Sequence, residues 1–290
     1  MWKFVENLIF IFKAIIIGIV EGITEFLPVS STGHMIIVGH LIGFKEGMLP
    51  KELYTKQYID AFTMIIQLGA ILAIVVLYWN KISSTFQNFS PKKTKSGFKF
   101  WLNVCIACIP AAFLGVVLGL DDIIEEKLFN PVTVTVALLV GAIWMLYAEK
   151  RYRGKFTTKS IDDVNVKQAF IIGAFQCLAM WPGMSRSAST IIGAWIAGLS
   201  TVAAAEFSFF LALPVMIGVS IIKLIKINIL ALHSMQIIAL TVGFVVSFVV
   251  ALIVVDKFIS FLQKKPMRVF AIYRIFIGII LLGLILLNVL

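Results

Sequence analysis

This 290-residue sequence is divided into long apolar runs separated by short polar segments. A transmembrane helix needs about 20 largely apolar residues to cross a hydrocarbon core roughly 30 Å thick. Six runs reach or approach that length, and we predict that each spans a membrane: 58–79, 100–119, 131–149, 206–226, 236–256 and 269–290. Hydrophobic residues make up 60% of the chain and charged residues 14%, whereas soluble proteins average about 45–50% and about 25%. The sequence therefore predicts an all-α polytopic membrane protein.

Two further apolar stretches are interrupted by polar residues. In the first, an apolar run over 8–27 is broken at Pro28, and the run that follows, 35–43, is too short to cross the membrane. The second stretch, 168–199, is broken in the same way around Pro182. The backbone at such a break cannot face lipid, because its N–H and C=O groups would have no partners there. Each stretch is therefore predicted to form a re-entrant helical hairpin whose break lines a cavity.

The two broken stretches align with each other at an offset of 155 residues. The aligned pairs include Gly18 with Gly173, Glu21 with Gln176, Ser30 with Ser185, Ser31 with Arg186 and Ile36 with Ile191. A repeat that occurs once per half is typical of duplicated membrane folds whose broken helices meet near the bilayer midplane. We therefore expect one integral membrane domain built from two inverted repeats, over about 1–149 and 168–290, each with one hairpin and three spans.

The distribution of Lys and Arg among the loops predicts the orientation. The loops over 80–99, 150–167 and 257–268 contain five, six and four of these residues, and the other connecting segments contain at most three. Because cytoplasmic loops carry the excess of Lys and Arg, the three rich loops are predicted to be cytoplasmic. The second hairpin then enters the membrane from the side opposite to the first. This loop bias also accounts for the net charge of +10, so no nucleic-acid partner is expected.

The first hairpin contains two carboxylates, Glu21 and Glu25, placed one helical turn apart. A charged side chain inside a bilayer costs about 2.5–3.5 kcal/mol on insertion scales, so such residues are functional candidates. Like charges on one helix face repel each other unless a cation or a proton lies between them. Three interpretations remain open: a bound divalent ion, one carboxylate that acts as a base, or a structural ion pair.

The second hairpin contains Arg186 within a cluster of hydroxyl side chains. The planar guanidinium matches a pair of phosphate oxygens, and the N–H groups of helices that start after Ser31 and Ser185 would add an anion site. Seven hydroxyls lie at the two breaks: those of Ser30, Ser31 and Thr32 in the first hairpin, and those of Ser185, Ser187, Ser189 and Thr190 in the second. Some of them could instead cap the helices at the breaks. An anionic phosphate is therefore the predicted ligand.

A nucleophile and a base are also available in the first hairpin. Ser31 and His34 lie three residues apart, so the imidazole could take the hydroxyl proton directly or with a carboxylate orienting it. A purely structural role for His34 is the alternative.

Four blocks of the sequence closely resemble one family, the undecaprenyl-diphosphate phosphatases or bacitracin-resistance proteins. The blocks are EGITEFLPVSSTGHMIIVGHLIGF at 21–44, PGMSRSAST at 182–190, EFSFFLALPVMIG at 206–218 and FAIYR at 270–274. The resemblance covers essentially the whole chain, and the first two blocks are long enough to be specific.

The resemblance implies a hydrolase of the bacterial inner membrane that acts on a phosphoric anhydride. Such an enzyme removes the terminal phosphate of undecaprenyl diphosphate and so recycles the lipid carrier for peptidoglycan and other cell-wall polymers. The resemblance also implies an active site open to the outer face and a requirement for Mg²⁺ or Ca²⁺. The expected catalytic residues are Ser31, His34, Glu21, Glu25 and Arg186, with Glu21 and Glu25 as metal ligands. The expected substrate-binding residues are Ser30, Thr32, Ser185, Arg186, Ser187 and Thr190.

Other mechanisms and functions are compatible with some of these residues. Acid-phosphatase-type lipid phosphatases use a nucleophilic His six residues after an Arg and an Asp four residues later, but here those positions are Ile192 and Ile196. Ser31 is therefore the better nucleophile, and direct attack by water on the diphosphate is the alternative. Inverted repeats also occur in transporters, so a lipid-phosphate transporter is the competing function.

The sequence leaves three questions open: the prenyl chain length, the role of Arg274, and the oligomeric state, for which a homodimer is one option.

Overall fold

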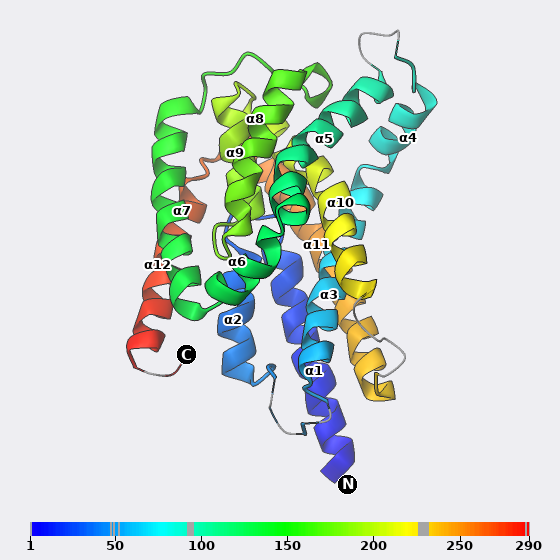
Figure 1. Ribbon diagram of the computed structural model, residues 1–290, viewed down its shortest axis with the longest axis vertical. Helices are drawn as coiled ribbons and strands as arrows, with labels where there is room; N and C mark the ends of the chain where they lie inside the picture. Colours follow the sequence, from blue (N-terminus) through cyan, green and yellow to red (C-terminus); the bar gives the residue numbers. More distant parts are fainter. Residues whose placement is uncertain are drawn as a thin grey trace.

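The computed structural model is all-helical apart from a single β-bridge between Thr158 and Leu199 in the part of the chain that it describes (Figure 1). That part excludes residues 1, 47, 49, 52, 92–95, 226–231, 288 and 290, and only the backbone is described for residues 2, 3, 121, 122, 125, 223 and 224.

Within the described residues, six helices are long and apolar enough to cross a membrane, and they coincide with the six predicted spans. They are α3 (Lys56–Leu77), α5 (Gly97–Ala112, continued by a π-helical turn, Phe113–Val117), α7 (Pro131–Tyr152), α10 (Thr201–Ile225), α11 (Ser234–Lys264) and α12 (Arg268–Leu286). The prediction of a polytopic helical membrane protein is therefore confirmed.

The two predicted hairpins are also present. The first consists of α1 (Trp2–Thr24) and α2 (Ser31–Ile42), and the second of α8 (Val166–Gln176), a 3₁₀ turn (Cys177–Met180) and α9 (Arg186–Ile196). The first break contains Pro28, which disfavours a helical conformation at the residue before it. In the second break Gly183 adopts φ 100°, a conformation that only glycine adopts readily. In Figure 1, α1 and α2 occupy the lower half of the molecule, and α8 and α9 the upper half.

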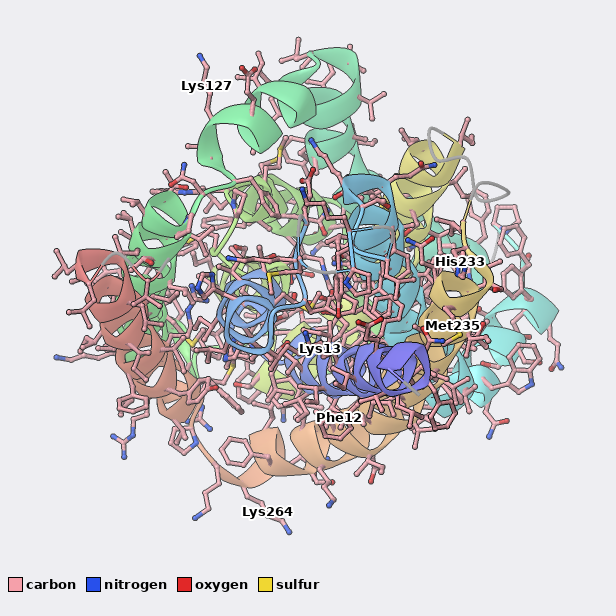
Figure 2. The ribbon with its side chains drawn as sticks, turned by 90° about the horizontal axis from the view of Figure 1, so that it is seen from below. Phe12, Lys13, Lys127, His233, Met235 and Lys264 are labelled. Atoms are coloured by element: carbon pink, nitrogen blue, oxygen red, sulfur yellow. The ribbon has the colours of Figure 1, made fainter. Side chains whose placement is uncertain are left out.

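Close packing fixes α1 against α11. A Cβ atom added to Gly18 would lie 2.7 Å from the carbonyl oxygen of Gly243, and one added to Gly22 would lie 2.7 Å from that of Ser247. Small residues of this kind allow membrane helices to approach closely. Figure 2, which views the molecule from the end where α1 begins, shows α2 almost along its axis near the centre. There Lys13 of α1 donates a hydrogen bond of 3.1 Å to the Gly43 carbonyl, directly after α2.

The three loops rich in Lys and Arg contact one another at one end of the molecule. Lys81 forms an ion pair with Asp162 at 2.5 Å, and Arg153 donates a hydrogen bond of 3.0 Å to the Lys265 carbonyl. Two short helices within connecting segments were not predicted: α4 (Trp79–Gln87) and α6 (Leu120–Leu128). Helix α4 is amphipathic, with Ile82 buried and its aromatic side chains exposed.

Candidate active site

The two helix breaks share an unusual backbone conformation. Ser30 and Ser185 have φ angles of 73° and 71°, and they are the only non-glycine residues with positive φ in the described chain. Each is the N-cap of the helix that follows: the Ser30 hydroxyl accepts from the Gly33 N–H at 3.4 Å, and the Ser185 hydroxyl accepts from the Ala188 N–H at 3.3 Å. Helix α9 thus starts directly after Ser185, as predicted, whereas α2 starts at Ser31, one residue earlier than predicted. The two aligned serines have equivalent geometry. Strained residues of this kind concentrate at functional sites.

Glu25 joins the two breaks. Its Oε1 accepts a hydrogen bond of 3.1 Å from Arg186 Nη2, and its Oε2 accepts one of 2.8 Å from the Ser31 hydroxyl. The other guanidinium nitrogen, Arg186 Nη1, donates to the Ser208 carbonyl at 3.0 Å, which orients the Arg186 side chain from α10. A carboxylate, a cation and a hydroxyl from opposite hairpins therefore meet in one hydrogen-bonded set, at the point where the two breaks were predicted to meet.

A cavity of about 150 Å³ lies beside this set. Its walls come from both breaks and from α3 and α10: Glu25, Ser30, Ser31, Thr32, Gln67, Ala179, Pro182, Gly183, Ser185, Arg186 and Met216. Pockets for drug-sized ligands measure roughly 300–1,000 Å³. This cavity therefore has room for a small polar group, but a long prenyl chain would have to lie outside it.

Glu21 is not part of the cavity wall, and it interacts electrostatically with two residues that are, Glu25 and Arg186. Its side chain is 0% exposed, and neither carboxylate oxygen has a hydrogen-bond partner in the described chain. Buried carboxylates are costly unless they are paired, protonated or bound to a metal. No cluster of three or more His, Cys, Asp and Glu side chains that could bind a metal on their own occurs among the described residues.

The structure corrects the expected contact between Ser31 and His34. Nδ1 of His34 lies 2.7 Å from the Ser30 carbonyl, and Nε2 lies 2.7 Å from the hydroxyl of Tyr273 on α12. Since a carbonyl can only accept, Nδ1 carries the proton, and Nε2 of the neutral ring accepts from Tyr273. The bond from His34 to the Ser30 carbonyl orients the imidazole ring along α2, away from the Ser31 hydroxyl. Within the described chain, the Ser31 hydroxyl donates instead to Glu25.

Two predicted substrate-binding residues lie behind the cavity rather than in its wall. The Ser187 hydroxyl is fully buried and donates to the Leu27 carbonyl at 2.9 Å, which ties the second break to the first. The Thr190 hydroxyl, also fully buried, is 2.6 Å from the Ser208 hydroxyl. Both contacts hold α9 in place. Ser30, Thr32, Ser185 and Arg186 do line the cavity, as expected.

Arg274, whose role the sequence left open, holds both breaks. It is 0% exposed and donates to five backbone carbonyls at 3.0–3.4 Å. The acceptors are Pro28 in the first break, Gly183 and Met184 in the second, and Ala137 and Leu138 in α7. Sequence reasoning also missed Tyr273, although it lies in the FAIYR block, and Gln67, an amide near the middle of a predicted span.

Comparison with known proteins gives a consistent result. A family model described as "Bacitracin resistance protein BacA" matches residues 14–280. A protein of Clostridium novyi named undecaprenyl-diphosphatase is 74% identical over 284 residues, which cover 98% of this chain and 99% of that protein. Undecaprenyl-diphosphatase 2 of Clostridium acetobutylicum is 57% identical, with 96% and 97% covered, and the Clostridium tetani undecaprenyl-diphosphatase is 54% identical, with 95% and 96% covered. The chain therefore belongs to the BacA family of bacitracin-resistance proteins.

Proposed function

We propose that this protein is a membrane-embedded undecaprenyl-diphosphate phosphatase. It hydrolyses undecaprenyl diphosphate to undecaprenyl phosphate and inorganic phosphate, recycles the carrier lipid for cell-wall synthesis, and thereby confers resistance to bacitracin. The observation that carries the proposal is the hydrogen-bonded set of Ser31, Glu25 and Arg186 on the wall of a small polar cavity. The relatives named undecaprenyl-diphosphatase, at up to 74% identity, support it.

Each member of this set has a role in phosphoryl transfer. Glu25 accepts the proton of the Ser31 hydroxyl as the oxygen attacks the terminal phosphorus, and the bond to the leaving lipid monophosphate breaks. Arg186 and the N–H groups at the start of α2 and α9 bind the phosphoryl oxygens, on which negative charge is distributed in the transition state. Electrostatic stabilisation of this kind is usually the largest catalytic contribution. Water then splits the phosphoserine, returning a proton to Ser31 and releasing phosphate.

The transport alternative explains less of the site. A lipid-phosphate transporter needs a cation and compensating carboxylates at the membrane midplane, and Arg186 and Glu25 could serve that purpose. It assigns no role to the hydrogen bond of 2.8 Å between the Ser31 hydroxyl and Glu25, which is the contact of a nucleophile with its base.

The residues present fit a hard divalent cation. Mg²⁺ binds through one or two carboxylates together with substrate phosphate oxygens, and Ca²⁺ also takes oxygen ligands. Glu21, whose buried carboxylate oxygens have no hydrogen-bond partner in the described chain, and Glu25 would hold such an ion. When bound, the ion would supply positive charge that neutralises the diphosphate.

We further infer an inverted-repeat fold, in one domain of the bacterial inner membrane, with the site accessible from the outer face. Three observations support this inference. The aligned serines Ser30 and Ser185 share one capping geometry, the hairpins occupy opposite halves of the molecule (Figure 1), and the basic loops contact one another at a single end. If that end is cytoplasmic, the first hairpin enters from outside.

The activity is tested with purified protein in detergent. Wild-type protein is expected to release inorganic phosphate from farnesyl diphosphate and from undecaprenyl diphosphate, to leave the prenyl monophosphate as the other product, and to lose activity when a chelator is added. Binding of the diphosphate without any release of phosphate would contradict the proposal and favour the transporter.

A second prediction concerns Glu21. Glu21→Gln removes a fully buried carboxyl group that lacks a hydrogen-bond donor and lies close to the Glu25 carboxylate, so the metal-free variant should be more stable than wild type. A gain of about 1–2 kcal/mol corresponds to a rise of roughly 2–8 °C in unfolding temperature. Added Mg²⁺ or Ca²⁺ should stabilise wild type by binding to the folded state and should leave the variant almost unchanged, as measured by thermal unfolding with and without EDTA.

Glu25→Gln is the matched control for this experiment. Glu25 is paired with Arg186, so its replacement leaves a partly buried cation without its partner and should lower the unfolding temperature. If Mg²⁺ and Ca²⁺ stabilised the Glu21→Gln variant as much as wild type, Glu21 could not be a metal ligand.

A further inference from the structure

Gln67 lines the cavity of the candidate active site with a side-chain amide that has no hydrogen-bond partner in the described chain. It lies near the middle of α3, a span of 22 residues, and its side chain lines the cavity together with Arg186 and Ser31. No hydrogen bond of the Gln67 side chain to another residue occurs in the described part of the chain. The side chain is partly exposed to the cavity, so its N–H and C=O groups are available to a ligand that enters there.

The packing of α3 fixes the direction of this amide. On the adjoining face of the helix, the Ile66 carbonyl accepts a hydrogen bond of 2.8 Å from Ser247 of α11. A Cβ atom added to Gly69 would lie 2.5 Å from the Phe244 carbonyl oxygen, so α11 packs directly on the α3 backbone there. The helix therefore cannot rotate to remove Gln67 from the cavity.

Most of the other polar groups in the cavity wall already make hydrogen bonds within the protein. Both oxygens of Glu25 accept hydrogen bonds, from Ser31 and from Arg186, and the Ser30 and Ser185 hydroxyls cap their helices. A ligand that enters the cavity thus finds Arg186 and the helix N-termini on the side of the breaks, and a neutral N–H donor on the side of α3.

We propose that Gln67 is a substrate-contacting catalytic residue whose side-chain N–H group donates a hydrogen bond to the diphosphate. This inference rests on the proposed phosphatase function. A neutral amide suits the position, because a phosphate accepts from it and an empty cavity is not left with another buried charge. Side-chain amides are among the groups that stabilise developing negative charge in transition states. The hydrogen bond would also bring a third element, α3, into a site otherwise formed by the two hairpins.

The test compares three variants with wild type. Gln67→Met keeps the length of the side chain and removes the donor, so kcat/KM for farnesyl diphosphate is expected to fall about 10- to 100-fold. Gln67→Glu adds a negative charge beside the phosphate and should lower it further. Thr63→Val is the matched control, since the Thr63 hydroxyl is bonded to the Ile59 carbonyl of the same helix and lies outside the cavity wall. Its activity should stay within about threefold of wild type.

A binding measurement separates this inference from the proposed function. Inorganic phosphate should raise the unfolding temperature of wild type and of Thr63→Val, and the rise should be lost in Gln67→Met. An inactive wild type would refute the phosphatase itself. An active wild type, with unchanged kcat/KM and an unchanged phosphate effect in Gln67→Met, would refute only the role of Gln67.

Discussion

Replacing Ser31 by alanine is expected to reduce the release of phosphate from prenyl diphosphates by at least about 10³-fold, or about 4 kcal/mol in activation free energy. The Ser31 hydroxyl is the nucleophile in the proposed mechanism, and its one side-chain hydrogen bond in the described chain, 2.8 Å to Glu25, places the base beside it. Loss of the nucleophile removes the covalent route altogether. The fold should be retained, since the side chain is half-buried beside a cavity.

The matched control is Thr135→Val. The Thr135 hydroxyl is buried and also makes a single hydrogen bond, to the Pro131 carbonyl of its own helix, but it lies outside the cavity wall. Its loss should lower the free energy of unfolding by about 1 kcal/mol and leave kcat close to that of wild type. A Ser31→Ala protein that kept a tenth of wild-type activity would contradict the serine mechanism and indicate that water attacks the phosphorus directly, with Glu25 as its base.

Acid quenching of wild type supplies independent evidence on the intermediate. With a substrate labelled in the terminal phosphate, label should be recovered on the protein at Ser31 during turnover. A protein that turns over rapidly and never carries the label would exclude a phosphoserine that accumulates.

The membrane spans and the two breaks were predictable because they depend on local properties of the sequence. Apolar runs of about 20 residues have few alternatives in a bilayer, and at the first break Pro28 is followed directly by a run of hydroxyl residues that favours a helix start over a continuous helix. The meeting of the two breaks was predicted from the repeat, and it is this meeting that brings Glu25 to Arg186. The short amphipathic helix α4 was missed, because a window of transmembrane length averages over nine residues of mixed character.

The contacts that sequence reasoning missed depend on side-chain direction and on distant segments. His34 was expected to reach Ser31, but on a helix its ring nitrogen can bond to the carbonyl four residues earlier, as it does with Ser30. Its second partner, Tyr273, is 239 residues away in the sequence. Gln67 reaches the site only because α11 fixes the rotation of α3. Neither spacing nor composition contains that information.

Replacing Arg274 by methionine is expected to destabilise the protein by about 3–5 kcal/mol, because several buried carbonyls lose their donor at about 1–3 kcal/mol each, and to abolish most of its activity. The guanidinium donates from Nε, Nη1 and Nη2 to carbonyls in three separate segments. Without it, the carbonyls of Gly183 and Met184 in the second break lose a charged donor inside the membrane, where an unsatisfied group costs about 1–3 kcal/mol. The breaks that position Ser31 and Arg186 would then no longer be held together.

Arg274→Lys tests whether geometry or charge is required. Lysine keeps the charge but offers three donors from one atom, which cannot reach carbonyls on three sides as a planar guanidinium does. We expect Arg274→Lys to lose most of the stability that Arg274→Met loses, with a fall in kcat for the protein that remains folded. Gly141→Ala should act in the same direction, because a Cβ atom at position 141 would collide with the Arg274 guanidinium.

Arg153→Lys is the control that makes this comparison decisive. Arg153 likewise donates to a backbone carbonyl, that of Lys265, and it also pairs with the Glu149 carboxylate, but its side chain is 30% exposed in a loop. Lysine keeps the positive charge beside Glu149, and a side chain at the surface can adjust its position, so this variant should be nearly as stable and as active as wild type. If Arg274→Lys behaved like Arg153→Lys, a positive charge alone would suffice between the breaks. In that case the five hydrogen bonds of Arg274 would not be required to position Ser31 and Arg186.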